Sequence, residues 1–282
     1  MLETRDLTIR FGGHVAVDHV SCAFVPGTLT AIVGPNGAGK TTYFNLISGQ
    51  LPASAGQVLL AGEDITRLAA PLRTRRGLGR AFQLTQLFPN LTVRENVRLA
   101  IQARESGRGR GGPFGGLDVW RVWLDRRAWI DEAQAVLDQV RLADKALQTA
   151  SSLPHGDQRK LEVALLIALD PQVFMFDEPT AGMGVDEVPV ILDLIRALKV
   201  RRDATILLVE HKMDVVRELA DRIIVLHNGA LVADGEPAAV IASPIVQQAY
   251  LGVFDPEVSA AAEPVGSPTR HFPSERGSSQ HV

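Results

Sequence analysis

Short apolar runs alternate with amphipathic segments along most of the chain. The runs with the length and residue types of buried strands are LTAIV (29–33), QVLLAG (57–62), GLGRAFQ (77–83), PQVFMFDEP (171–179) and TILLVE (205–210). The segments with helical periodicity between and after them are KTTYFNLISG (40–49), EVPVILDLIRALKV (187–200) and MDVVRELADR (213–222). Strands that alternate with helices predict an α/β fold with a mainly parallel sheet.

Two segments depart from this alternation. From Thr92 to about Leu169 the pattern is helical, which predicts an inserted helical block. Near the end of the pattern, IIVLHNGALVADG predicts a hairpin that turns on Asn228-Gly229, because this dipeptide suits the positive φ angles of a tight turn. The chain from about Asp255 onward is rich in Ala, Pro, Ser and Gly, and this composition predicts a disordered tail.

Composition narrows the class of protein only slightly. The 282 residues are 46% hydrophobic and 22% charged, as in ordinary globular proteins, and the net charge of -3 gives no bias toward nucleic acid or anionic lipid. The single cysteine, Cys22, excludes an internal disulfide framework and suits a reducing compartment. The N-terminus lacks a signal-peptide pattern, and the longest apolar run, Val163–Leu169, is far shorter than the about 20 residues that span a bilayer. We therefore expect a cytosolic chain that reaches a membrane only through a partner.

The segment GPNGAGKTT fits the pattern G-x-x-x-x-G-K-[ST] between a predicted strand and a predicted helix. Its glycines let successive N–H groups point at phosphate oxygens, and the helix N-terminus adds positive potential. Lys40 would then reach the β- and γ-phosphates, and Thr41 would ligate Mg²⁺. The predicted nucleotide-binding residues are Gly34, Pro35, Asn36, Gly37, Ala38, Gly39, Lys40, Thr41 and Thr42.

The apolar run VFMFDEP ends in two adjacent carboxylates, Asp177 and Glu178. In P-loop ATPases a buried strand carries such acids at its carboxyl end, where Asp177 would help to hold Mg²⁺ and Glu178 would polarise the attacking water. Taken alone, two solvated acids at a strand end fit equally well. The phosphate loop upstream favours the catalytic interpretation.

A cluster of helix breakers, SSLPHGDQRK (151–160), stands directly before the apolar segment LEVALLIAL. Gly156 allows close approach to the backbone, and the N–H groups at the start of the following helix would point at a phosphate. An ordinary turn without a function is the alternative interpretation.

Together these stretches resemble the ATP-binding-cassette (ABC) ATPases over about residues 1–252. The resemblance implies a P-loop NTPase core of the ABC ATPase type: a mainly parallel sheet flanked by helices, an N-terminal antiparallel β element and an inserted helical subdomain at 85–170. Residues 253–282 lie beyond the resemblance and match the predicted disordered tail.

In that family the breaker cluster is the signature motif, usually Leu-Ser-Gly-Gly-Gln, which caps the γ-phosphate of the ATP held by the other nucleotide-binding domain. The residues that would contact the partner's ATP are Leu153, Pro154, His155, Gly156 and Asp157. Only Leu153 and Gly156 match the usual motif, and the missing serine hydroxyl removes one donor to the phosphate.

Further positions follow from the same resemblance. Phe11 corresponds to the aromatic residue that stacks on adenine, and Gln83 to the glutamine that links Mg²⁺ with the transporter contact. His211 corresponds to the switch histidine that contacts the γ-phosphate, so Glu178, His211 and Gln83 form the expected catalytic set. The segment AGMG (181–184) resembles the D-loop, although Gly184 stands where aspartate is common.

Within the family, the chain is similar to the larger ATPase of branched-chain amino-acid importers. The shared features are RFGG, AFQLTQLFPNLTVRENV, the insert after Arg104, EHKMDVV and the ending AYLG. Related members serve urea or short amides. The resemblance implies ATP hydrolysis that drives solute import through separate membrane permease subunits, at the cytoplasmic face of the inner membrane.

The partners implied are a second ABC ATPase subunit, either a sister chain or a second copy, which closes a nucleotide sandwich, and indirectly an external solute-binding protein. A soluble ABC ATPase acting on ribosomes or DNA, and a nucleotide-responsive regulatory module, are the alternatives. The insert at 104–127 fits a solvated loop before an amphipathic helix as well as a docking surface. We predict that it docks on a protein and that the chain binds no nucleic acid.

Overall fold

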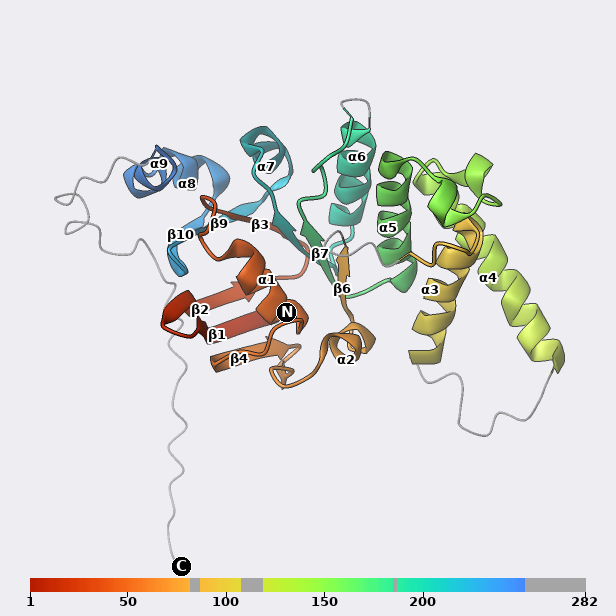
Figure 1. Ribbon diagram of the computed structural model, residues 1–282, viewed down its shortest axis with the longest axis horizontal. Coiled ribbons are helices and arrows are strands. Elements are labelled where there is room, and N and C mark those ends of the chain that lie inside the picture. Colours follow the sequence, from red (N-terminus) through yellow and green to blue (C-terminus); the bar gives the residue numbers. More distant parts are fainter. Residues whose placement is uncertain (82–86, 108–118, 185–186, 252–282) are drawn as a thin grey trace, which may run out of the picture.

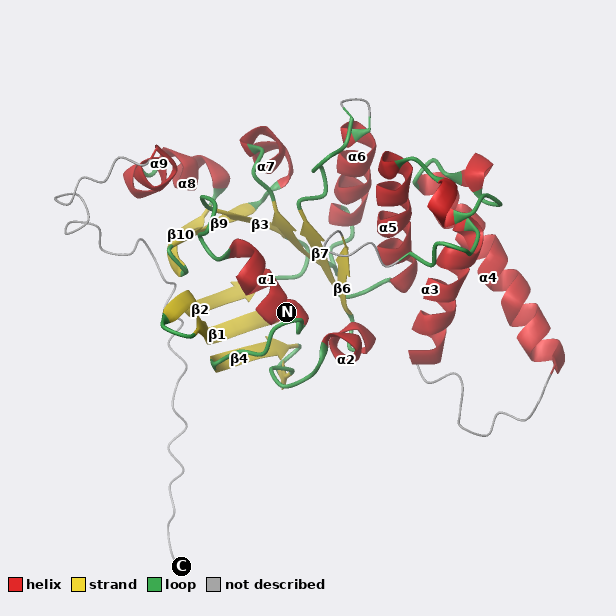
Figure 2. Cartoon of the chain, viewed as in Figure 1, coloured by secondary structure: helices red, strands yellow, loops and turns green. Residues whose placement is uncertain are grey.

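The computed structural model describes residues 1–81, 87–107, 119–184 and 187–251; of residues 106, 107, 119–126 and 249–251 it describes the backbone alone. Two sheets organise the described chain (Figures 1 and 2). One has four strands in the order β2-β1-β4-β5, and the other has six in the order β10-β9-β3-β8-β7-β6. The α/β fold expected from the sequence is confirmed.

The smaller sheet is the antiparallel element at the N-terminus. Its strands are β1 (Leu2–Phe11), β2 (His14–Phe24), β4 (Ala55–Leu60) and β5 (Glu63–Asp64). Strand β1 pairs antiparallel with both β2 and β4. Figure 1 shows this sheet beneath one side of the larger one, with the helix α1 (Lys40–Ser48) beside both. Side chains of α1 and of both sheets share one apolar core, so α1 packs against both sheets.

The larger sheet is parallel except at one edge. The parallel strands are β3 (Leu29–Val33), β6 (Leu78–Ala81), β7 (Val173–Asp177), β8 (Thr205–Val209) and β9 (Arg222–His227). All residues of β3, β7 and β8 are buried, as expected for strands covered on both faces. Strand β10 (Ala230–Gly235) closes the predicted hairpin, in which Asn228 and Gly229 have φ angles of 49° and 81°.

A second apolar core joins the other face of this sheet to the helical insert. The insert contains α3 (Val93–Gly107), α4 (Val119–Gln139), two short 3₁₀ turns at Ala143–Lys145 and Ala150–Ser152, and α5 (His155–Leu169). Thr92 and Glu95 form a capping box at the start of α3. In Figure 1 these helices stand at the right-hand end of the molecule, beyond β6.

The remaining helices complete the cover of the larger sheet. They are α2 (Ala70–Arg75), α6 (Val188–Lys199), α7 (Met213–Leu219), α8 (Pro237–Ala242) and α9 (Pro244–Leu251). Among the described helices, none has the length and apolar character that a membrane crossing needs. The parallel strands β3, β7 and β8 end at the same edge of the sheet, and the loops that leave these ends carry the predicted site.

Candidate active site

The loop from Gly34 to Gly39 connects β3 to α1 and is held by close backbone contacts. A Cβ atom on Gly39 would lie 2.4 Å from the carbonyl oxygen of Ala16, and one on Gly34 would lie 2.2 Å from that of Leu226. Gly39 also has a φ of 95°, which side chains other than glycine rarely adopt. Only glycine fits at both positions, so the pattern read from the sequence has a structural cause here.

Lys40 opens α1 with its ammonium group turned back into the loop. The side chain is only 6% exposed, and Nζ donates to the carbonyl oxygens of Gly34 at 2.7 Å and Pro35 at 2.9 Å. Burial lowers the pKa of Lys40, whereas the negative charges of Glu178 and Asp177 act in the opposite direction. The cation is therefore positioned at the centre of the loop and faces the two acids predicted from the sequence.

Asp177 forms a buried ion pair with Arg80, a residue that the sequence analysis did not single out. The two side chains are 5% and 7% exposed, and Arg80 Nη2 donates to Asp177 Oδ2 at 2.7 Å. Burial raises the pKa of Asp177, while the positive charge of Arg80 opposes that rise. Arg80 also donates to Asn45 and Ser48 of α1, at 2.6 and 2.8 Å, so it joins the helix of the phosphate loop to the carboxylate at the end of β7.

Glu178 and His211 meet across the ends of β7 and β8. Glu178 Oε1 lies 2.7 Å from His211 Nε2, and both side chains are partly exposed. Glu178 has a φ of 50°, a left-handed backbone conformation that is uncommon for a residue other than glycine and concentrates at functional sites. Its amide donates to the carbonyl of Val209 at 2.9 Å. The structure thus brings together the predicted general base and the predicted switch histidine.

Glu210, directly before His211, is a further buried carboxylate that the sequence analysis did not single out. It is 3% exposed, and both of its oxygens accept hydrogen bonds. Oε1 accepts from Thr180 Oγ1 at 2.5 Å, and Oε2 accepts from the backbone N–H groups of His211 at 2.9 Å and Lys212 at 3.3 Å. Glu210 therefore links the segment after β7 to the segment after β8.

The other predicted nucleotide-binding residues differ in their exposure to solvent. Phe11, at the end of β1, is 50% exposed, so its ring is available for stacking. Thr41 and Thr42 are half-buried in the first turn of α1. Gln83 falls outside the described residues.

The predicted signature segment caps the start of α5. Pro154 and His155 are exposed, whereas Leu153 is buried in the apolar core of the insert. The buried Asp157 carboxylate pairs with Lys145 and, at 2.8 Å, with Lys160. The exposed residues Pro154 and His155 are thus available to another molecule, whereas Leu153, Gly156 and Asp157 are buried within the chain.

Gly156 lies against the carboxylate of Glu187. A Cβ atom on Gly156 would come within 1.7 Å of Glu187 Oε1, so this position accommodates only hydrogen without rearrangement. Glu187 Oε2 accepts from the backbone N–H of Gly184 at 3.1 Å. Glu187 therefore links the predicted D-loop to the predicted signature inside one chain.

Part of the insert has an internal role. Arg104 forms a bidentate ion pair with Glu132 of α4, at 2.8 and 3.0 Å, and donates to the carbonyl oxygen of Ala168 at 3.1 Å. It therefore joins α3, α4 and α5. The side chains of residues 106–126, which make up most of the insert for which we predict docking on a protein, lie outside the described residues.

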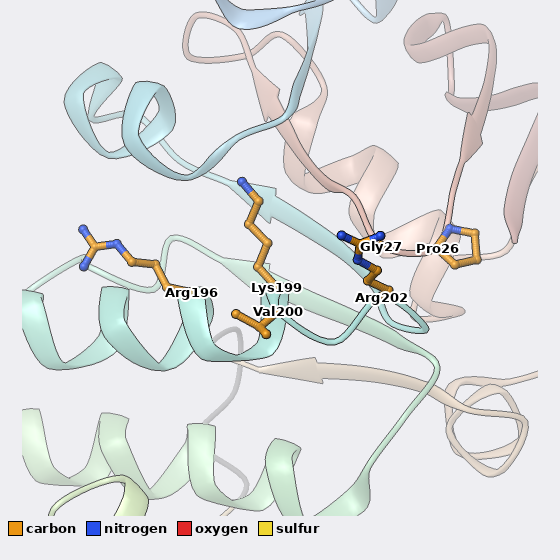
Figure 3. Close-up of a pocket in the computed structure, with 6 residues that line it drawn as sticks. All are labelled: Pro26, Gly27, Arg196, Lys199, Val200 and Arg202. Carbon is orange, nitrogen blue, oxygen red and sulfur yellow. The ribbon is translucent and has the colours of Figure 1, made fainter.

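A separate pocket of about 670 Å³ lies at the opposite ends of the strands, where β3 begins and α6 ends. Figure 3 shows its lining residues, Pro26, Gly27, Arg196, Lys199, Val200 and Arg202. Arg196 pairs with Asp193 and Glu218, and Lys199 pairs with Asp221. Two of its cations are thus already neutralised, and the pocket takes no part in the site described above.

Comparison with known proteins identifies the class of this chain. Residues 17–181 match the family model described as ABC transporter. Two solved ATP-binding cassettes of an ABC transporter have the same fold: the ADP conformation of MJ1267 (TM-score 0.72, 28% identity, 90% of this chain and 99% of that one) and a nucleotide-free cassette (TM-score 0.74, 28% identity, the same coverage). The chain belongs to the ABC transporter family and is an ATP-binding subunit that hydrolyses ATP.

Two transport ATP-binding proteins are similar to this chain over most of its length. The high-affinity branched-chain amino acid transport ATP-binding protein LivG of Escherichia coli (strain K12) is 36% identical over 255 residues, which cover 89% of this chain and 98% of that protein. The corresponding protein BraF of Pseudomonas aeruginosa is 36% identical over 252 residues, with the same coverage. The resemblance to ABC ATPases read from the sequence is confirmed.

Proposed function

We propose that this chain is the ATP-hydrolysing subunit of an importer for branched-chain amino acids. The observation that carries the proposal is its 36% identity to LivG over nearly the whole length of that protein. We further propose that residues 1–252 form the nucleotide-binding domain, that 85–170 form its helical subdomain, and that 253–282 form a disordered tail. The transport relatives disfavour the alternatives of a ribosome- or DNA-directed ATPase and of a regulatory module.

ATP would bind along the loop at the start of α1. Phe11 would stack on the adenine, and the N–H groups of the Gly34–Thr42 loop would bind the phosphate oxygens. Lys40 would exchange its two carbonyl acceptors for the β- and γ-phosphates, which are stronger acceptors because they are charged. No large movement of the Lys40 side chain is needed, since its ammonium group already lies inside the loop.

The oxygen donors near the loop suit Mg²⁺. The Thr41 hydroxyl and the Asp177 carboxylate, with Gln83, supply few protein ligands and leave room for phosphate oxygens, as Mg²⁺ prefers. When bound, the ion would neutralise charge on the β- and γ-phosphates. Arg80 now holds the Asp177 carboxylate, and we propose that it keeps that carboxylate in place for the ion.

Glu178 would accept a proton from the water that attacks the γ-phosphate. His211 holds Glu178 Oε1 at 2.7 Å and so fixes the direction of the carboxylate. In the nucleotide-bound state we expect His211 to contact the γ-phosphate as well, which would report the presence of ATP to the base. A carboxylate held in this direction would be able to act as a general base once the attacking water lies within hydrogen-bond reach of it.

A second ATPase subunit would complete each site. Its signature motif would close on ATP bound to Lys40 of this chain, while Pro154, His155 and Gly156 would close on the partner's ATP. The exposure of Pro154 and His155 supports this arrangement, in which Gly156, now buried against Glu187, would have to become accessible. Permease subunits would receive the closing movement at the cytoplasmic face of the inner membrane, and an external binding protein would deliver the solute.

The test is a scan of solutes with the assembled transporter. The chain would be purified with its permease subunits, a partner ATPase and a solute-binding protein, and ATP hydrolysis would be measured with each candidate solute. Stimulation by leucine, isoleucine or valine is the expected result. Stimulation by urea or short amides alone would reassign the solute, and stimulation by nucleic acid or ribosomes would overturn the proposal.

A further inference from the structure

Glu210 is a buried carboxylate whose hydrogen bonds within the described part of the chain go to Thr180, His211 and Lys212. It directly follows the last residue of β8, and it is 3% exposed. A buried carboxylate is costly unless it is fully hydrogen-bonded, and Glu210 meets that condition with three donors. Such an arrangement requires a reason at this position, one residue before His211.

The donors come from the two chain segments that carry the proposed catalytic pair. Thr180, two residues after Glu178, donates its hydroxyl to one carboxylate oxygen of Glu210. The backbone N–H groups of His211 and Lys212 donate to the other oxygen. Lys212 is also the N-cap residue of α7, so the same carboxylate fixes the turn that presents His211 and the helix that follows it.

The link acts beside the contact between Glu178 and His211. The segments leave the sheet from β7 and β8, whose pairing ends at Asp177 and Val209 and is continued by the bond from Glu178 N to Val209 O. Beyond that bond, two side-chain contacts join the segments: Glu178 to His211 at the exposed surface, and Thr180 to Glu210 in the interior. The contact between Thr180 and Glu210 therefore bears on the distance between the two segments, and so on the distance between Glu178 and His211.

We propose that Glu210 is a positioning residue for ATP hydrolysis, which acts through Thr180 and the backbone of His211 to hold His211 against Glu178. The inference rests on the proposed roles of Glu178 and His211. Both Glu210 oxygens are occupied within the protein, so Glu210 does not transfer the proton of the attacking water. Its contribution is geometric, and a displacement of about 1 Å in such a pair can cost about 100-fold in rate.

The test compares variants that keep the link with variants that break it. In Glu210→Gln the amide can donate to the Thr180 hydroxyl while its oxygen accepts from the His211 N–H, so kcat should stay within about threefold of wild type. Glu210→Met has similar length without acceptors, and Thr180→Val removes only the hydroxyl. Both should lower kcat by about 10- to 100-fold, with the KM for ATP within about twofold of wild type.

Two further variants serve as controls. Thr180→Ser restores a hydroxyl and should recover most of the rate. Thr30→Val removes a buried threonine hydroxyl, on β3 of the same sheet, that has no hydrogen-bond partner among the residues the structure describes, and it should leave kcat unchanged. In a His211→Ala background, Thr180→Val should produce no additional loss in single-turnover hydrolysis, because its effect passes through His211.

Three results would overturn the proposal. A Glu210→Gln enzyme as inactive as Glu178→Gln would make Glu210 a proton-transfer group. If Thr180→Val and Glu210→Met have the same kcat as the control Thr30→Val, Glu210 does not position His211. If Glu210→Met and Thr180→Val lower the affinity for ATP and the melting temperature together with kcat, Glu210 only stabilises the fold. If Glu178→Gln itself hydrolyses ATP normally, the proposed base is wrong, and this outcome is separate from the behaviour of Glu210.

Discussion

Lys40 shows how a single side chain can be placed by its surroundings before any ligand binds. Its ammonium group is buried, holds two carbonyl oxygens and faces two carboxylates. The free energy that keeps a buried ammonium charged comes from these neighbours, and triphosphate oxygens can replace the carbonyls. Removing the charge should therefore affect binding of ATP more than the fold.

Lys40→Ala should raise the dissociation constant for ATP by about 10- to 100-fold, because it removes charged hydrogen bonds worth about 1.5–3 kcal/mol. Arg202→Ala is the matched control, since it removes a cation at the opposite ends of the strands. The check is titration with a fluorescent ATP analogue. Equal affinities for Lys40→Ala and Arg202→Ala would show that Lys40 does not face the phosphates.

Gly156 offers a second prediction at the residue scale, since a methyl group there would meet Glu187. The Glu187 side chain can rotate away, at the cost of its bond from Gly184 N–H, so Gly156→Ala should lower the free energy of unfolding by about 1 kcal/mol. Adding Glu187→Ala should abolish the further cost of Gly156→Ala. Chemical denaturation of the wild type, the two single variants and the double variant tests this coupling. Strictly additive changes in the free energy of unfolding would contradict it.

The apolar strands, the phosphate loop and the turn at Asn228-Gly229 could be predicted because each depends on residues adjacent in the sequence. The Arg80–Asp177 and Thr180–Glu210 pairs could not, because they require the knowledge that β6 lies beside β7 and β7 beside β8. An arginine inside the apolar run GLGRAFQ was the only local signal for the first pair. The link between Glu187 and Gly156 depends on how α5 and α6 pack, which spacing alone does not reveal.

At the scale of elements, Asp157 ties α5 to the turn that contains Lys145. Burial raises the pKa of Asp157, but its hydrogen bonds and ion pairs with Lys145 and Lys160 outweigh this effect, so the pKa lies below its ordinary value of 3.8. A carboxyl whose pKa falls on folding stabilises the folded state above its ordinary pKa. That stabilisation is lost as the pH drops through the folded value.

Asp157→Asn should therefore lower the free energy of unfolding by about 1–3 kcal/mol at pH 7, with the same difference at pH 5. The difference should shrink only below about pH 3.8. Urea denaturation of both proteins across this range provides the measurement, with Asp193→Asn, an exposed residue of α6, as the control. A difference that already disappears between pH 7 and pH 5 would mean that the pKa of Asp157 is raised.

At the scale of the whole molecule, the signature and the phosphate loop of one chain should serve different ATP molecules. Pro154 has neither a hydroxyl nor an amide proton, so the partner's phosphate would rely on Gly156, His155 and the start of α5. Pro154→Ser should be neutral or mildly activating. Gly156→Asp, which places a carboxylate against that phosphate, should impair hydrolysis chiefly at the partner's site.

This prediction requires a mixed complex in which only one subunit keeps its catalytic glutamate, so that turnover is measured at one site at a time. Gly156→Asp combined with Glu187→Ala separates the effect on the phosphate from the internal contact with Glu187. If Gly156→Asp silences only the site built on Lys40 of the same chain, the assignment to the partner's ATP is wrong.

The central claim is that hydrolysis at Glu178 drives import, and uptake into proteoliposomes tests it most directly. Vesicles would contain the permease and ATPase subunits with ATP inside, and the binding protein with radiolabelled leucine outside. We predict ATP-dependent uptake with the wild-type chain. With Glu178→Gln we predict a loss of at least about 100-fold, although ATP affinity is retained. Undiminished uptake with Glu178→Gln would contradict the account.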